Sequence, residues 1–456
     1  MESSKRPHES DISKECFIPT KKTSRDDYKS RKDNFMQWCS RERINIGPKV
    51  MISREGSCAQ FGMVAIADVK ESECLFEVPR HCVLRPETSS VAEIIKEDQL
   101  VSESGWVKLL ISLLYEYTNP SSRWRPYFEM VPEFSEVDLP MFWDRSERLV
   151  ELRGTGVDMA VEKDLENVKK EFNNIVLPFI RKHDDKFPID LYKRMVAFVM
   201  AYSFTEPERE EDSDIDTEDM PITKSPPMMV PVADILNHIA KNNASLQFGK
   251  ESLKMVIMTV TCQVHRKVIL RLGQVQVGNF LYLCFQGEEV YNTYGQLANN
   301  QLLHMYGFAE QYPDNHFDTV DIPMKLIYEV AKQETEDVDL LDEKWEFLQG
   351  MVMQNDGVFV IGADGVLTEE ELYHTLKVLN LNRAEFEDHR EKEGWSDDNE
   401  DEENMTFETF SGYAQSPEED EKQLQNLSTL SRRKKYSLFV RNGQRKLLQR
   451  LLQCCQ

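Results

Sequence analysis

The sequence lacks the features that would place it in several common classes of protein. Its longest apolar runs, at 175–180 and 196–201, are far shorter than the roughly 20 residues that a membrane-spanning helix needs. The N-terminus has no apolar stretch after its first charges and carries Glu2, Glu9 and Asp11, so neither a secretory signal nor a transit peptide is expected. A membrane partner is therefore not expected.

Cysteine pairs with CxxC spacing are also missing. The nine cysteines include no CxxC pair, so the sequence predicts neither a structural zinc site nor any other metal site. An odd number of cysteines without a secretory signal is typical of reduced thiols in the cytosol or nucleus.

Positive charge is scarce. The chain has 55 basic and 80 acidic residues, which gives a formal net charge of −25. Because binding of phosphates needs a basic patch, nucleic acid is not expected as a direct partner. An acidic surface attracts a basic ligand such as a lysine-rich tail, although the same charge could serve solubility alone.

The patterning indicates an α+β protein of two or three domains in 456 residues. Residues 1–30 are polar and aperiodic, and we predict that they are disordered. A short helix is expected over 32–45, with Phe35, Trp38 and Cys39 on one side. Strand-like alternation follows at 50–53, 62–69 and 74–79.

Helical periodicity then dominates an insert of about 88–225, and dense acidic charge at 206–219 predicts a solvated loop. Strand character returns from 228 to about 294. From 311 to 456 we predict an all-α C-terminal domain, with a capping box of Thr368 and Glu371 and a second acidic loop at 397–403.

Two segments carry the candidate chemistry. The first, DILNH at 234–238, places Asn237 and His238 directly after an apolar run. The second, GEEVYNTYGQLANNQLLHMYGF at 287–308, supplies Tyr294 and Tyr306. In this order the two segments resemble the SET-domain methyltransferases, in which an Asn-His pair holds S-adenosylmethionine and a later tyrosine lies beside the methyl group.

The resemblance extends over most of the chain, from about residue 34 to the C-terminus, and is strongest to the SET enzymes related to plant Rubisco large-subunit methyltransferase. It also includes SGWVKLL, SRWRPYF, GTGVDMAVEKDL, MAYSF and MYGFAEQYPDN. It implies a SET domain of small sheets with a helical insert over 31–310, followed by a substrate-binding domain over 311–456. Many SET enzymes carry a cysteine cluster after this domain, and this chain has none.

The resemblance implies a protein-lysine N-methyltransferase that uses S-adenosyl-L-methionine and acts in the nucleus, with the cytoplasm as an additional location. The implied substrates are histone tails and transcription factors of the NF-kappa-B type. Tyr294 is the implied catalytic residue, and Trp106 and Tyr202 would line the lysine channel. The implied cofactor-binding residues are Gln60, Phe61, Gly62, Tyr202, Asn237, His238 and Tyr306.

One departure from the family pattern affects the function. An apolar stretch of about 262–286 intervenes between the strand near 260 and the segment with Tyr294. It is either a retained intron read in frame or a true lineage-specific loop. A SET-fold adaptor with weakened catalysis therefore stays open. The resemblance leaves a second alternative, a protein-histidine methyltransferase, because some relatives methylate histidine.

Overall fold

The computed structural model describes residues 25–98, 100–130, 138–183, 185–207, 225–258, 282–351, 357–391 and 417–454. The chain divides into two compact units that interleave in sequence. The first comprises Met1–Glu136, Val168–Leu236 and Leu246–Glu289, and the second comprises Val137–Asn167, Asn237–Ser245 and Val290–Gln456.

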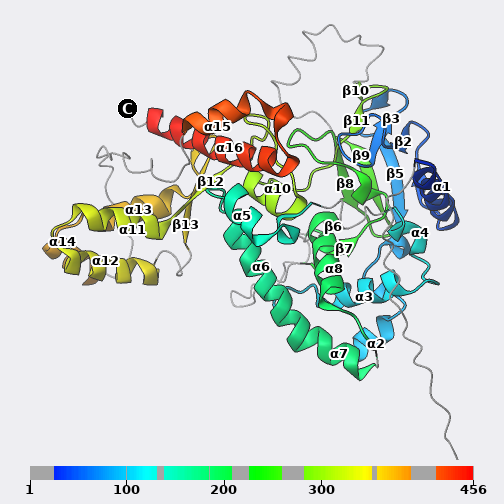
Figure 1. The fold of residues 1–456 in the computed structure, drawn as a ribbon, viewed down its shortest axis with the longest axis horizontal. Helices are drawn as coiled ribbons and strands as arrows, with labels where there is room; N and C mark the ends of the chain where they lie inside the picture. Colours follow the sequence, from blue (N-terminus) through cyan, green and yellow to red (C-terminus); the bar gives the residue numbers. More distant parts are fainter. Residues whose placement is uncertain are drawn as a thin grey trace, which may run out of the picture. The chain divides into compact units, whose positions relative to one another are not determined.

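Small antiparallel sheets form the framework of the first unit. The largest has the order β1-β5-β9-β8, and the strands β5 and β9 lie side by side in Figure 1. The strand β5 buries Leu75, Phe76 and Val78, which stabilises the sheet by removing apolar surface from water. The bounds are β1 (Asn45–Ile46), β5 (Cys74–Pro79), β8 (Ala244–Phe248) and β9 (Ser252–Ile257).

Shorter strands complete this framework. A three-stranded sheet has the order β11-β3-β2, and two-stranded sheets join β10 to β4 and β6 to β7. The bounds are β2 (Val50–Ser53), β3 (Gly62–Ala65), β4 (Val69–Lys70), β6 (Ser203–Phe204), β7 (Met228–Met229), β10 (Tyr282–Cys284) and β11 (Glu289–Val290).

Helices of the first unit bury aromatic side chains. Phe35, Trp38 and Cys39 lie on the buried side of α1, as predicted. The helices α3 and α8 pack against each other. The bounds are α1 (Arg25–Arg41), α2 (Ala92–Glu97), α3 (Val107–Thr118), α4 (Arg125–Phe128), α7 (Leu177–Lys182) and α8 (Ile189–Tyr202).

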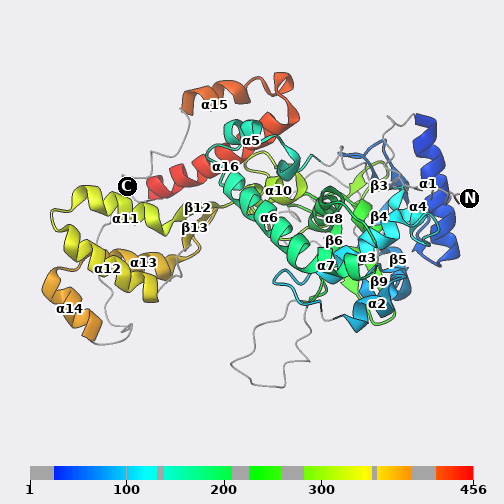
Figure 2. The same cartoon turned by 60° about the horizontal axis from the view of Figure 1, so that its bottom comes forward.

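The second unit combines helices with one small sheet. Leu348, Phe359, Phe386 and Leu447 share an apolar core, which joins α16 to the helices and strands that precede it. Figure 2 shows α11, α12 and α13 grouped near β12 and β13. The helices are α5 (Arg145–Glu151), α6 (Val157–Glu171), α10 (Asn299–Tyr306), α11 (Met324–Glu334), α12 (Val338–Met351), α13 (Glu369–Asn380), α14 (Arg383–Glu391), α15 (Pro417–Leu424) and α16 (Arg432–Cys454).

Three sequence-based expectations need correction. The helix predicted to start at 32 begins at Arg25, so residues 25–30 are helical. The predicted all-α C-terminal domain also contains a sheet of β12 (Val320–Pro323), β13 (Val358–Gly362) and β14 (Gly365–Val366), in that order. The predicted capping box is absent, because the Thr368 hydroxyl accepts the Val360 N–H at 3.0 Å instead of capping α13.

Part of the apolar stretch predicted as an insertion belongs to the framework. Its final residues form β10, which pairs with β4, and the Gln286 N–H donates to the Asp68 Oδ1 at 3.1 Å. Cys284 is fully buried. Residues 262–281 lie outside the described part of the chain, as do residues 1–24, most of the acidic stretch 206–219 and all of 397–403.

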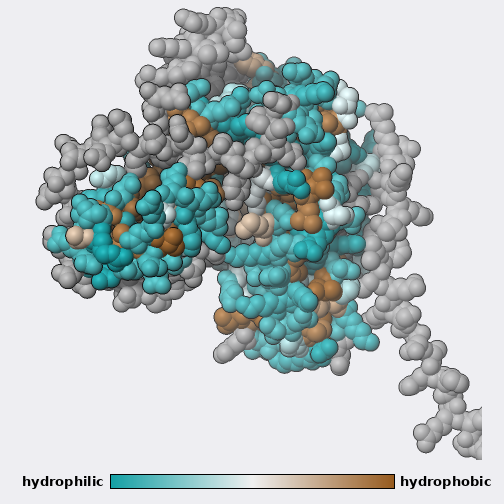
Figure 3. All heavy atoms as spheres, turned by 60° about the vertical axis from the view of Figure 1, so that its left-hand side comes forward, coloured by the Kyte–Doolittle hydropathy of each residue, from teal (hydrophilic) through white to brown (hydrophobic). Residues whose placement is uncertain are grey.

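The described surface is predominantly hydrophilic on the face that Figure 3 shows, where apolar residues occur in separate small groups. Within the described segments, no helix is both long and apolar enough to cross a membrane.

The close approach of α16 to Asp318 gives a test of packing in the second unit. A Cβ added at Gly443 would lie 2.1 Å from the Asp318 Oδ2, and Asp318 is buried. We expect Gly443→Ala to lower the free energy of unfolding by about 1–3 kcal/mol because the carboxylate has little room to move. Gly350→Ala in α12 is the matched control, because no atom lies within 4 Å of its added Cβ. Thermal and denaturant unfolding should show a loss for the first variant alone, and equal effects would contradict this packing.

Candidate functional site

The parts of the two motif segments that belong to the second unit, from Asn237 and from Val290 onward, lie side by side. The Asn292 N–H donates to the Asn237 carbonyl at 2.9 Å, and His238 and Asn292 form an isolated parallel β-bridge. Near by, the Asn243 Oδ1 accepts the Tyr291 N–H at 2.8 Å. Residues about fifty positions apart in sequence are thereby held next to each other.

The turn that leads into Asn237 has an unusual backbone. Val232 has φ 75° and ψ −44°, a region that β-branched residues rarely adopt. It precedes the short 3-10 helix η6 (Ala233–Ile235), in which the Asp234 carboxylate accepts the Tyr127 hydroxyl at 2.5 Å. Strained backbone is often found at functional sites, and this strain directly precedes the predicted cofactor residues.

His238 anchors the backbone of Tyr294. The Tyr294 N–H donates to the His238 Nδ1 at 3.0 Å, and the two rings stack with centroids 5.0 Å apart. The Tyr294 ring also stacks with the Tyr306 ring, with centroids 4.6 Å apart. The centroid of the Phe308 ring lies 6.5 Å from that of Tyr294. The structure thus brings together three predicted side chains, those of His238, Tyr294 and Tyr306, beside Asn237.

This aromatic cluster carries little charge. Burial lowers the pKa of His238 to about 4, against an opposing contribution from the Asn292 backbone. Burial also raises the pKa of Tyr306 to about 12. Imidazole and phenol are therefore both neutral near pH 7.

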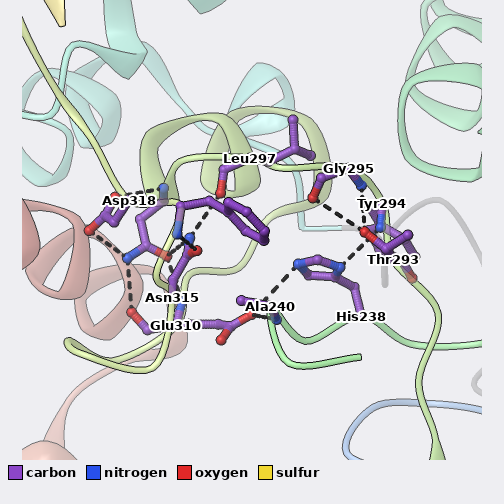
Figure 4. A network of polar contacts seen from close by, with 11 residues as sticks. His238, Ala240, Thr293, Tyr294, Gly295, Leu297, Glu310, Asn315 and Asp318 are labelled. Atoms are coloured by element: carbon purple, nitrogen blue, oxygen red, sulfur yellow. Dashed lines mark hydrogen bonds and ion pairs between the residues drawn. The ribbon is translucent and has the colours of Figure 1, made fainter. Parts of the chain in front are cut away.

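A buried polar network, drawn in Figure 4, continues from His238 to helix α10. The Glu310 Oε1 lies 3.6 Å from the His238 Nε2 and accepts the Ala240 N–H at 2.7 Å. The Glu310 N–H donates to the Asn299 Oδ1 at 2.8 Å. Asn299, which is fully buried, donates in turn from its Nδ2 to the Asp318 carboxylate at 2.9 Å.

Sequence reasoning missed this network and the Tyr127–Asp234 pair. Asp234 lies in the DILNH motif and Glu310 in MYGFAEQYPDN, so their positions in the sequence indicate that they are near the site. Their partners come from distant segments, however, and only the fold shows which donors they meet.

The remaining predicted residues belong to the first unit. Tyr202 ends α8 with its ring 5.4 Å from Phe198, and Trp106 is half-buried directly before α3. Gln60 accepts hydrogen bonds from Arg54, and the ring of Phe61 meets the edge of Tyr28 at 6.3 Å. Gly62 opens β3 opposite Ser53. Their assignment to the cofactor or the lysine channel stays a prediction.

One group of potential metal ligands occurs among the described residues of the first unit. Ligand atoms of Glu42, His81 and Cys82 all lie within 4.8 Å of one another. Burial raises the pKa of the Cys82 thiol to about 12, which disfavours the thiolate that a metal would bind. The cluster therefore gives no basis for assigning a metal.

Known proteins resemble this chain along most of its length. It is 46% identical over 383 residues to N-lysine methyltransferase setd6 of Salmo salar, covering 82% of this chain and 79% of that protein. It is 42% identical over 454 residues to setd6 of Xenopus laevis, with 92% and 94% covered. The identity to SETD6 of Homo sapiens is 38% over 478 residues, with 92% and 94% covered.

Two further comparisons concern domains and fold. Residues 335–448 match the Rubisco LSMT substrate-binding family. The fold is similar to the SET domain of LSMT bound to lysine and AdoHcy, with a TM-score of 0.63, 18% identity, and 94% of this chain and 91% of that chain covered. The structure of Rubisco LSMT bound to AdoMet gives a TM-score of 0.62 at 17% identity, with 93% and 91% covered. These likenesses confirm the predicted α+β SET fold.

The neutral state of His238 predicts a specific dependence of stability on pH. Its folded pKa of about 4 lies below the ordinary histidine pKa of 6.5, so the unfolded chain binds the proton at a higher pH than the folded chain does. The contribution of neutral His238 to the free energy of unfolding is therefore fully present above pH 6.5. It is lost as the pH falls from 6.5 towards the folded pKa of about 4. Between pH 7 and pH 5 the loss is roughly 2 kcal/mol.

We expect His238→Asn to remove this part of the pH dependence, because the Asn oxygen can still accept the Tyr294 N–H but does not titrate. Burial raises the pKa of Asp318 to about 6 and also raises that of Glu310. These two groups make stability fall as the pH rises, in wild type and in His238→Asn alike. The difference between wild type and variant in urea unfolding at pH 5 and pH 7 isolates His238. Parallel curves for wild type and His238→Asn would contradict the prediction.

Proposed function

Because the chain belongs to the SETD6 family of N-lysine methyltransferases, we propose that the cluster of His238, Tyr294 and Tyr306 is its methyl-transfer site. The observation that carries this proposal is the Tyr294 N–H bond to His238, together with the stacking of Tyr294 between two rings. It fixes the tyrosine of the NTYG motif in one place beside Asn237.

The proposed methyl donor is S-adenosylmethionine, which supplies an electrophilic methyl on a positively charged sulfonium. The described side chains fit such a group, because aromatic faces attract cations. With a pKa of about 4, His238 adds no second positive charge that would repel the sulfonium. The Asn237 carboxamide offers both donors and acceptors for the polar parts of the cofactor.

The chemistry at lysine needs a neutral amine, since the ammonium form has no lone pair for attack on the methyl. The ordinary pKa of lysine is near 10.4, and loss of hydration in a narrow apolar channel lowers it. Alignment of the amine with the methyl–sulfur bond then supplies much of the rate. In this proposal the Tyr294 hydroxyl orients the amine, and Trp106 and Tyr202 line the channel.

The proposed substrates are lysines of histone tails and of NF-kappa-B-type transcription factors, and the proposed site of action is the nucleus. The formal net charge of −25 supports a basic partner, because opposite charge accelerates encounter. Radiolabelled methyl transfer to histone and transcription-factor fragments, followed by mass spectrometry of the acceptor, tests this. Methyl-lysine supports the proposal, methyl-histidine indicates the protein-histidine alternative, and cofactor binding without transfer indicates the adaptor.

Tyr294→Phe removes the hydroxyl oxygen. It leaves the backbone bond to His238 and both ring stacks in place, because none of them uses the hydroxyl. We expect turnover to fall by about 100-fold, a size typical for loss of one group that acts in the transition state, with little change in cofactor affinity. Steady-state kinetics and calorimetry measure the two quantities. Tyr373→Phe, at a partly exposed position on α13, is the matched control. Near-normal turnover of the first variant would remove Tyr294 from the site.

Asn237→Ala should act on binding instead. Its amide is proposed to bond the cofactor, so its removal leaves polar groups unpaired and weakens affinity by roughly 1–3 kcal/mol. Calorimetric titration with the cofactor measures the change. An unchanged affinity would show that Asn237 does not contact it.

A further inference from the structure

Glu310 lies where it can control the orientation and the tautomer of His238. It follows Phe308 in the MYGFAE segment, beyond the end of α10, and its Oε1 lies 3.6 Å from the His238 Nε2. The other imidazole nitrogen, Nδ1, accepts the Tyr294 N–H at 3.0 Å. Both ring nitrogens of His238 therefore face a defined partner.

These two partners require one state of the ring. A nitrogen that accepts an N–H bond carries no proton, so the neutral ring must hold its proton on Nε2. The Glu310 Oε1, 3.6 Å from Nε2, is the acceptor that faces this proton in the proposal below. The opposite tautomer would place a proton on Nδ1 against the Tyr294 N–H and release the backbone of Tyr294.

Glu310 is itself held in place. The Ala240 N–H donates to the same Oε1 at 2.7 Å. The Glu310 N–H and carbonyl form a reciprocal pair with the Asn299 side chain, at 2.8 Å and 3.1 Å. The Asp318 carboxylate accepts both the Asn299 N–H and its Nδ2, each at 2.9 Å. This chain of buried bonds ties Glu310 to the first turn of α10.

We propose that Glu310 is a positioning residue for methyl transfer, which acts through His238 to hold the backbone of Tyr294. The inference rests on the proposed function, in that it takes Tyr294 as the catalytic tyrosine. The nearby charges do not replace Glu310, because Asp314 pairs with Lys241 at 3.8 Å and neither is bonded to His238 among the described contacts. Supporting groups of this kind matter because active-site geometry must be held within about half an ångström.

The first test reads the imidazole directly and needs no turnover. The full-length protein is labelled with ¹⁵N-histidine, and the His238 signals are assigned by their loss in His238→Asn. We expect wild type to show protonated Nε2 and unprotonated Nδ1 at pH 7. Glu310→Ala should shift the population toward the Nδ1–H tautomer, in which the ring can donate to the Asn292 carbonyl. Glu310→Gln should keep the wild-type tautomer, since its single carbonyl oxygen can accept from both Ala240 and His238.

The second test measures the consequence for the reaction. We expect Glu310→Ala to lower kcat by about tenfold, because misplacement of a reacting group costs mainly rate. Cofactor Kd and substrate KM should stay within about twofold, and Glu310→Gln should recover most of the rate. Asp314→Asn is the control, because it removes a neighbouring carboxylate that pairs with Lys241 at 3.8 Å. A uniform loss in Ala and Gln variants, or a fall in kcat matched by an equal loss of cofactor affinity, would overturn the positioning role.

The two tests separate the possible failures. An unchanged His238 tautomer in Glu310→Ala overturns the inference whether or not the protein transfers methyl groups. A changed tautomer in a wild-type protein that methylates no substrate supports the placement of His238 and overturns the proposed function.

Discussion

The site depends on one hydrogen bond, from the Tyr294 N–H to the His238 Nδ1. It joins two segments that are 56 residues apart and fixes the backbone from which the Tyr294 ring projects. Because the bond is made by the main chain, it does not use the Tyr294 hydroxyl. The ring stacks with Tyr306 and His238 then restrict its remaining freedom.

This bond requires a neutral imidazole, and the surroundings favour that state. Burial opposes the charged form of His238, and Glu310 faces the nitrogen that must carry the proton. Asn299 and Asp318 hold the Glu310 segment, while Gly443 allows α16 to approach Asp318 closely. Packing of the C-terminal helix is thus connected to the orientation of the tyrosine through a continuous set of contacts.

Much of this arrangement could be predicted from the sequence. The strands around β2, β3 and β5 follow alternation, and the motif residues Asn237, His238, Tyr294 and Tyr306 were found by resemblance and meet in the structure. The polar partners could not be predicted, because hydrogen bonds between distant segments leave no periodic pattern. Local signals can also mislead: Thr368 precedes a helix, yet its hydroxyl bonds to the strand β13, whose VFVIG sequence lies within a region of mainly helical pattern.

Amide hydrogen exchange at Tyr294 tests the central constraint most directly. The account predicts that this amide exchanges much more slowly than that of Gly295, because its acceptor is the buried His238 whereas Gly295 donates to the exposed Thr293 hydroxyl. Residue-resolved exchange of the full-length protein at pH 7 makes the comparison within one molecule. Protection of Tyr294 would support the bond on which the site depends, and exchange as fast as that of Gly295 would contradict it.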